Sequence, residues 1–190
     1  MYGSKVDGSG KEIQGDSTYL SPVAGERVEG NTLVSIGLAE DKDGNVVDTR
    51  ANIVFQQANG AQVRVTLFEA VEQWQFDSLN KQVKHLATKL MTEEEYYAGI
   101  NAKGAPAGFQ DFVSKVSGLL TPLAAGKVFT MKFVYKNNYV SVPSFPNWIA
   151  LPENADTLTT NAKYDKYVKE EPTDIAEDEA SAMTTSTDVF

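Results

Sequence analysis

The residues best suited to chemistry in this chain are cations and aromatics at alternate positions of segments with the pattern of β-strands. They are Arg50, Arg64, Phe68, Lys132, Lys136 and Tyr139. Cations neutralise the phosphates of a nucleic-acid backbone, and each base stacked on an aromatic ring contributes about 1–3 kcal/mol. The combination is typical of sequence-tolerant binding to a single strand. It does not separate DNA from RNA, because recognition of the 2′-hydroxyl depends on local geometry.

Side chains suited to catalysis are scarce by comparison. The chain has one histidine, His85, and no cysteine, which excludes cysteine zinc sites and cysteine–histidine nucleophiles. The nearest approach to a phosphate loop, residues 124–127, lacks the first glycine and is followed by Val128 instead of Ser or Thr. The three glutamates at 93–95 fan around a helix start, where an electrostatic role suits them better. We therefore predict no enzyme activity, no metal and no cofactor.

An acidic segment, residues 170–190, closes the chain. It contains seven acids and no Lys or Arg, and it finishes with Asp188, Val189 and Phe190. A segment with so little apolar content cannot bury enough surface to offset the entropy of ordering, so we expect disorder. The terminal aromatic indicates a hook for a protein partner. A simple solubility tail is the alternative, because surface charge also promotes solubility.

Charge is distributed unevenly along the chain. The net charge of −9 falls to −2 when the −7 of residues 170–190 is set aside, and residues 81–139 carry eight Lys against four acids. An acidic chain would ordinarily argue against a nucleic-acid partner. Here the acids are concentrated in the first eighty residues and in the tail, so the middle of the chain remains suited to one.

Length and composition predict one soluble domain with flexible ends. We assign residues 1–30 to a glycine-rich N-terminal arm, 31–169 to the folded domain and 170–190 to the tail. No apolar run approaches the roughly 20 residues that span a bilayer, and the first residues lack the hydrophobic stretch of a signal peptide. Together with the absence of cysteine, this predicts a cytoplasmic protein that does not engage membranes.

The clearest structural pattern is a β-hairpin over residues 50–68. Asn59-Gly60 tolerates the positive φ angles of a type I′ turn, and the flanking runs alternate. Period-two alternation assigns one face to the core, with Ala51, Ile53, Phe55, Val63, Val65 and Leu67. The other face then carries Arg50, Asn52, Arg64, Thr66 and Phe68. Before the hairpin, residues 32–39 predict a strand, and residues 41–45 predict a turn without the glycine and glutamate positions of a calcium loop.

A helical period replaces the two-residue period after the hairpin. The apolar residues that recur at helical spacing are Leu79, Val83, Leu86 and Leu90. The opposite side of this predicted helix is basic, which adds Lys81 and Lys84 to the candidate contacts. His85 also falls on that side, so we expect it to face solvent and assign it no role.

Two more helices and a return to strand complete the domain. Thr92 and Glu95 predict a capping box, and a third helix runs from Phe109 until Pro122 and Gly126 break it. A strand over 129–136 then turns into a second one. This second strand covers residues 139–142, and further short extended segments are expected at 148–151 and 157–160. We expect both tryptophans, Trp74 and Trp148, to lie in the core or at a barrel end.

The order of these elements predicts a mainly β, α+β fold. Three strands, then helices, then two or more strands match the five-stranded OB barrel, whose helix lies between the third and fourth strands. The outer surface of the second, third and fourth strands would then form a groove that presents the cations and aromatics described above.

With this strand-rich body, its inserted helices, a basic and aromatic face, and an acidic tail ending in Phe190, the chain resembles phage single-stranded DNA-binding proteins. The resemblance covers the architecture from about residue 31 onward. It implies protection of single strands during replication, recombination and repair, in the host cytoplasm for a phage-encoded protein. It also implies that Asp188, Val189 and Phe190 recruit a polymerase, helicase or primase.

A second class of function remains open on the sequence. A structural or adaptor protein without DNA binding, such as a virion component, would dock partners through the tail and would cover the basic face with the N-terminal arm or a subunit interface. Salt dependence separates the two classes, because a protein that neutralises phosphates of a single strand binds more weakly as salt rises. Oligomeric state, the length of strand covered and cooperativity stay open.

Overall fold

The computed structural model describes residues 27–136, 139–143 and 147–159, with the backbone alone described at residues 136, 139 and 140. Within these residues, five strands form one antiparallel sheet in the order β3-β2-β1-β4-β7, and β5 pairs with β6. Three helices lie between β3 and β4 along the chain. The α+β class and the insertion of the helices after the third strand are therefore confirmed.

The elements have the following bounds. The strands of the large sheet are β1 (Arg27–Glu40), β2 (Val46–Gln56), β3 (Gln62–Phe68), β4 (Phe129–Lys132) and β7 (Ile149–Ala150). The small pair is β5 (Val134–Lys136) with β6 (Tyr139–Ser141). The helices are α1 (Gln73–Ala87), α2 (Glu93–Asn101), α3 (Phe109–Ala124) and the 3-10 helix η1 (Pro152–Thr157).

The long first strand, β1, joins the two halves of the sheet. Its residues from Thr32 onward pair with β2, whereas Arg27, Val28 and Asn31 pair with β4. A bulge lies where the partner changes, and Gly30 adopts a positive φ of 79° there. The buried amide of Asn31 donates to the carbonyl oxygens of Val28 at 2.7 Å and Phe129 at 3.2 Å. These bonds hold both edges of the bulge. The strand begins at Arg27, five residues before its predicted start at Thr32 and within the predicted N-terminal arm.

Both hairpin turns of the first three strands have the same form. Gly60 N donates to Gln57 O at 2.9 Å, and Gly44 N donates to Asp41 O at 3.2 Å. Each glycine has a positive φ, but Asn59 does not. The hairpin over 50–68 is confirmed, whereas its type I′ turn is wrong, since that turn needs positive φ at both central residues. The Asn-Gly pair is equally compatible with the structure observed, a type I turn followed by a glycine in the left-handed conformation.

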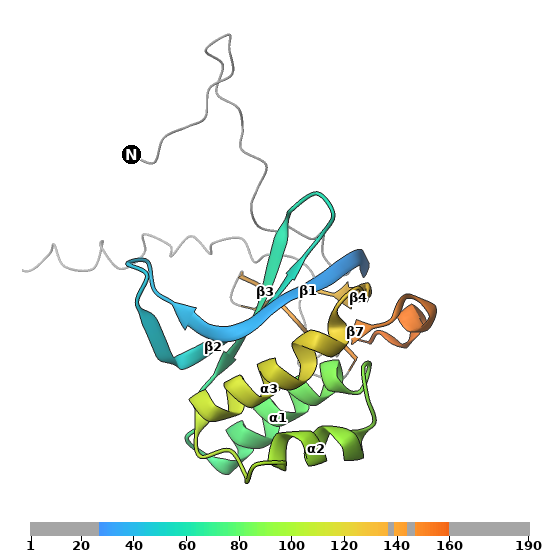
Figure 1. Ribbon diagram of the computed structural model, residues 1–190. Helices are drawn as coiled ribbons and strands as arrows, with labels where there is room; N and C mark the ends of the chain where they lie inside the picture. The colour runs from blue at the N-terminus through green and yellow to red at the C-terminus, as the bar shows by residue number, and fades with distance from the viewer. Residues whose placement is uncertain (1–26, 137–138, 144–146, 160–190) are drawn as a thin grey trace, which may run out of the picture.

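The three helices gather on one side of the sheet, where α3 packs on β1 and β2 (Figure 1). The predicted capping box of α2 is present, with Thr92 N donating to Glu95 Oε2 at 2.8 Å and Glu95 N donating to Thr92 Oγ1 at 3.2 Å. α3 continues past Pro122 to Ala124 and ends before Gly126, which has a positive φ of 73°, so its end lies between the two predicted breaking residues. Pro122 lies in the last turn of the helix, two residues before its end.

The core lies between the helices and the inward face of the sheet. All six inward residues predicted for β2 and β3 are buried, which confirms the period-two assignment: Ala51, Ile53, Phe55, Val63, Val65 and Leu67. Phe55 packs edge-on against Phe129 and Trp148, with ring centroids 6.1 and 6.0 Å away. Trp148 is 1% exposed, so its prediction as a core residue is confirmed.

The last strands differ from the sequence prediction. The strand expected over 129–136 is two strands, β4 and β5, interrupted at the buried Phe133. Residues 157–159 form no strand, because η1 extends to Thr157 and Leu158 is buried after it. Among the described residues β3 and β7 do not pair with each other, so the sheet is not closed into a barrel.

No helix in the described part of the chain has the length and apolar character needed to cross a bilayer. The predictions for the acidic segment, including Asp188, Val189 and Phe190, and for residues 1–26 of the arm fall outside the described residues. They stay predictions.

Candidate nucleic-acid interface

The face of β1, β2 and β3 that points away from the core is mostly polar. The strand register aligns its residues in rows across the sheet: Arg64 lies opposite Val54, which lies opposite Ser35, and Thr66 lies opposite Asn52. Inward neighbours of these residues are buried against the helices, so alternation directs this set outward. We call it the open face.

A depression of about 310 Å³ lies in the open face. It is lined by Ser35, Gly37, Leu38, Glu40, Asp41, Asn52, Val54 and Arg64. Gly37 lies opposite Asn52, and a side chain at position 37 would meet no atom within 4 Å. The missing side chain therefore leaves the hollow open. Asn52 Oδ1 accepts a hydrogen bond from Thr66 Oγ1 at 3.1 Å, which orients its amide.

The depression has an anionic end at the turn between β1 and β2. Asp41 Oδ1 accepts hydrogen bonds from the backbone N–H groups of Asp43 at 2.8 Å and Asn45 at 2.9 Å. These bonds hold the pKa of Asp41 below its ordinary value, and the bond from Asn45 has the largest effect. The carboxylate is therefore ionised at neutral pH, and an anion in the depression would lie nearer to Arg64 than to this turn.

Arg50 and Phe68 form the row next to Asn52 and Thr66. They are direct cross-strand partners, and the Phe68 side chain is 62% exposed. Two residues along a strand correspond to roughly 7 Å, so Arg64 and Phe68 lie about 13 Å apart along β3. The structure thus brings three of the predicted contacts, Arg50, Arg64 and Phe68, together on one face.

Lys132 does not join this group. It belongs to β4, which pairs with the first residues of β1, and its register partner is Arg27. Two strands, β1 and β2, separate it from β3. Thr130, at the position between Phe129 and Met131, is buried together with them, so burial does not alternate along β4. Three consecutive residues of β4 are buried and Lys132 is partly exposed, so the spacing of its residues says little about exposure.

Lys136 and Tyr139 lie in the separate β5–β6 pair, where they are register partners. Only their backbone is described, so the predicted contacts of both side chains stay untested. The strand break at Phe133 detaches them from β4. The single groove expected along three strands is therefore not continuous through Lys132 and Lys136 in the described sheet.

Lys81 and Lys84 lie on α1, in the helical layer that covers the core face of the sheet. Lys84 Nζ donates to Glu93 Oε1 at 2.9 Å, and this bond raises the pKa of Lys84. His85 is half-buried instead of facing solvent. Burial is the main cause that lowers its pKa, and repulsion from Lys89, Lys84 and Lys81 lowers it further.

Trp74 is the largest departure from the predicted site. It is 64% exposed, so the prediction that it packs in the core is wrong. It precedes Leu79 by five residues, and at 100° per residue this places the indole on the opposite side of α1 from the apolar stripe. The helical spacing in the sequence already indicated an outward position. The core prediction rested instead on the general tendency of large aromatics to occupy cores.

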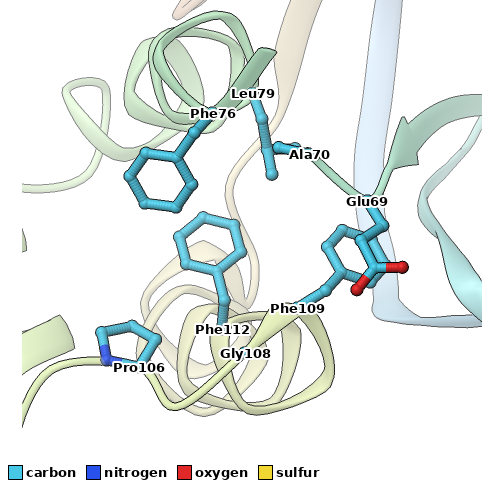
Figure 2. A pocket seen from close by; sticks show the side chains of 8 residues that line it. All are labelled: Glu69, Ala70, Phe76, Leu79, Pro106, Gly108, Phe109 and Phe112. Atoms are coloured by element: carbon cyan, nitrogen blue, oxygen red, sulfur yellow. The ribbon is translucent and has the colours of Figure 1, made fainter. Parts of the chain in front are cut away.

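A second hollow, of about 170 Å³, is apolar (Figure 2). It is lined by Glu69, Ala70, Phe76, Leu79, Pro106, Gly108, Phe109 and Phe112. Figure 2 shows the rings of Phe76 and Phe112 next to each other; their centroids are 6.4 Å apart and their planes are tilted by 56°. The one charge in its lining, on Glu69, is negative, so this hollow does not suit a phosphate.

No cluster of three or more His, Asp or Glu side chains among the described residues is arranged to hold a metal ion. The chain matches no protein-family model, no curated protein and no solved structure. The open face, with its depression and its Arg50, Arg64 and Phe68 side chains, is therefore the basis for a functional proposal.

Proposed function

We propose that this protein binds single-stranded DNA, with little sequence preference, across the open face of β1, β2 and β3. The observation that carries the proposal is the grouping of Arg50, Arg64 and Phe68 beside a polar depression on the face opposite the helices. Cations for phosphates and an exposed ring for base stacking are the two elements that sequence-tolerant binding requires.

The polar lining supplies the rest of the interaction. Asn52, Thr66 and Ser35 carry uncharged donors and acceptors that suit base edges or sugars, while Arg64 suits a phosphate. Glu40 and Asp41 lie at the far end of the depression and repel phosphates. A strand bound here would therefore keep its backbone on the arginine side.

The arrangement of the sheet supports the same proposal. We infer a partly open OB fold, since β1 pairs with both β2 and β4 and three helices are inserted after β3. In OB folds, the face of the second and third strands and the loop between the first and second bind oligonucleotides. The depression extends into this part of the sheet from β1: β2 contributes Asn52 and Val54, β3 contributes Arg64, and the β1–β2 turn contributes Asp41.

The cellular roles belong to the same proposal. By resemblance to phage single-stranded DNA-binding proteins, the protein would protect exposed strands during replication, recombination and repair in the cytoplasm. Its acidic segment, through Asp188, Val189 and Phe190, would recruit a polymerase, helicase or primase. The protective role requires the open face to bind DNA.

Fluorescence anisotropy of a labelled oligo-dT, across a salt series and against the matching duplex, tests the proposal. We expect tight binding to the single strand alone, weakening with salt at a logarithmic slope of about −0.7 for each phosphate neutralised. Arg64→Gln should weaken binding and flatten the slope. Lys127→Ala, which removes an exposed cation outside the open face, is the matched control and should bind like the wild type.

Two results would contradict the proposal. If the full-length protein binds no single strand at any salt concentration, the result favours the structural or adaptor function instead. If it binds but Arg64→Gln and Lys127→Ala weaken binding equally, the contact is a general effect of net charge and does not lie on the open face.

A further inference from the structure

The outer side of α1 carries a line of side chains that the open face does not account for. Trp74, Lys81 and His85 are spaced by seven and four residues, so they lie nearly above one another along the helix. They are opposite the buried Leu79 and Val83. At 1.5 Å per residue, Trp74 and Lys81 are about 10 Å apart along the axis.

Trp74 is held in place although it is exposed. Its Nε1 donates a hydrogen bond to Glu72 Oε2 at the start of the helix. The start of α1 is held in turn by Gln75 Oε1, which accepts from the N–H groups of Val71 at 2.8 Å and Glu72 at 2.9 Å. An oriented ring loses little further freedom when a base stacks on it, which favours binding.

Cations surround the rest of this line. Lys81, Lys84 and Lys89 all lie near enough to His85 to lower its pKa, although burial is the larger cause. Two carboxylates oppose them on the same layer. Glu93 pairs with Lys84 at 2.9 Å, and Asp77 accepts a hydrogen bond from Gln73 at 2.9 Å. Glu72, which accepts the hydrogen bond from Trp74, is a third carboxylate, so the three lysines are matched by three acids and Lys81 would contact a phosphate as a single cation.

The line is continuous along the chain with the open face. Phe68 ends β3, and Trp74 follows it by six residues, so their Cα atoms are at most about 20 Å apart. Large exposed apolar side chains are concentrated in this stretch, with Val71 88% exposed in addition to Phe68 and Trp74. Such a concentration indicates an interaction surface, whereas single exposed apolar residues are ordinary.

We propose that the outer side of α1 is a second contact surface for the same single strand, where a base stacks on Trp74 and a phosphate contacts Lys81. The proposal rests on the proposed function of the open face. A strand that leaves the open face at Phe68 would continue over the β3–α1 connection onto the helix. Short oligonucleotides would occupy the open face alone, and longer ones would reach both surfaces.

The test uses the full chain and two labelled oligo-dT probes of about four and about 16 nucleotides, the range that one OB fold covers. Trp74→Leu should lower affinity for the long probe by about fivefold or more, the equivalent of a stacking contribution of about 1 kcal/mol. Its affinity for the short probe should not change. Lys81→Ala should weaken binding of the long probe and reduce its salt slope by about 0.7, and Lys127→Ala again serves as the control.

Intrinsic fluorescence supplies an independent readout. The chain has two tryptophans, and Trp148 is buried, so quenching on binding would report mainly on Trp74. We expect the long probe to quench the wild-type protein, and the quenching to disappear in Trp74→Leu. Thermal unfolding should show that this substitution at an exposed position leaves the protein folded.

The failures are distinguishable. If the long probe binds wild type and Trp74→Leu equally and quenches neither, the α1 surface takes no part, while the open face keeps its function. If Trp74→Leu instead changes the molecular mass by light scattering and leaves DNA binding intact, this surface belongs to contacts between copies of the chain. If neither probe binds the wild type, the proposed function fails, and the α1 proposal fails with it.

Discussion

The two halves of the large sheet use their strands differently. In β2 and β3, burial alternates residue by residue, so one face packs on the helices and the other remains open. In β4 and β7, neighbouring residues are buried one after another: Phe129, Thr130 and Met131 in β4, and Ile149 and Ala150 in β7. The first half therefore presents a surface, and the second half closes the core.

The boundary between the halves lies in β1. Its register partner changes from β2 to β4 across the bulge that Asn31 holds. Because a ligand-binding surface needs an uncovered face, Arg50, Arg64 and Phe68 are the candidate contacts of the proposed function, and Lys132 lies apart from them. A strand buried on both sides offers side chains to the core alone.

The same substitution in each half gives the largest expected contrast. Thr130→Lys inserts a charge at a residue that is 1% exposed, and we expect a loss of several kcal/mol in the free energy of unfolding. Thr66→Lys, on the open face, should change stability by only about 1 kcal/mol through the lost hydrogen bond to Asn52. Urea unfolding of both variants measures the difference.

Thr66→Lys also sharpens the comparison through binding. The added cation lies between Arg64 and Phe68 along β3, so it should tighten binding to oligo-dT and steepen the salt slope by about 0.7. Equal stability losses in the two variants would contradict the division of the sheet into an open and a buried half.

The sequence predicted the open half well and the buried half poorly, for a physical reason. Alternation in β2 and β3 is visible because water on one side selects polar residues at every second position. In β4 consecutive residues are buried, so the two-residue alternation that predicted Lys132 beside Arg64 does not report which residues face solvent. The break at Phe133 depends on contacts with distant strands, which spacing along the chain does not encode.

Other differences arise where a short sequence motif is compatible with two local structures. Asn59-Gly60 fits a type I′ turn and also the type I turn with a left-handed glycine that forms. The exposure of Trp74 followed from helical spacing, but the residue type suggested a core position. Gly37, which opens the depression, is one of fourteen glycines and has no distinguishing neighbour in the sequence.

Filling the depression should separate binding from stability. Gly37→Val adds a β-branched side chain where no atom lies within 4 Å, in a strand that favours such residues. We expect the fold to remain, with unchanged or slightly higher stability, and affinity for oligo-dT to fall by about tenfold. Thermal unfolding and anisotropy measure the two effects.

The control for this substitution is Gly118→Ala on α3, where a Cβ also meets no atom within 4 Å. It should raise stability by up to about 1 kcal/mol through helix propensity and leave DNA affinity unchanged. Wild-type affinity in Gly37→Val would remove the depression from the binding surface and would leave only Arg50 and Phe68 of the open face as contacts.

The smallest expected effect comes from Asp41, whose side chain organises the turn at the anionic end of the open face. Its pKa is held below the ordinary value of 3.8, so the ionised form stabilises the fold. This contribution is complete above 3.8 and is lost as the pH falls below that value toward the pKa of the folded state. Asp41→Asn keeps an oxygen that accepts from Asp43 N and Asn45 N but removes the charge.

The wild type should therefore be slightly more stable than Asp41→Asn at neutral pH, and the difference should shrink once the pH falls below about 3.8. Urea midpoints of the two proteins across an acid series measure this difference. Glu95 and Asp111 also have lowered pKa values, but they are common to both proteins and cancel. A difference that stays constant with pH would show that the turn depends on the shape of the Asp41 side chain and not on its charge.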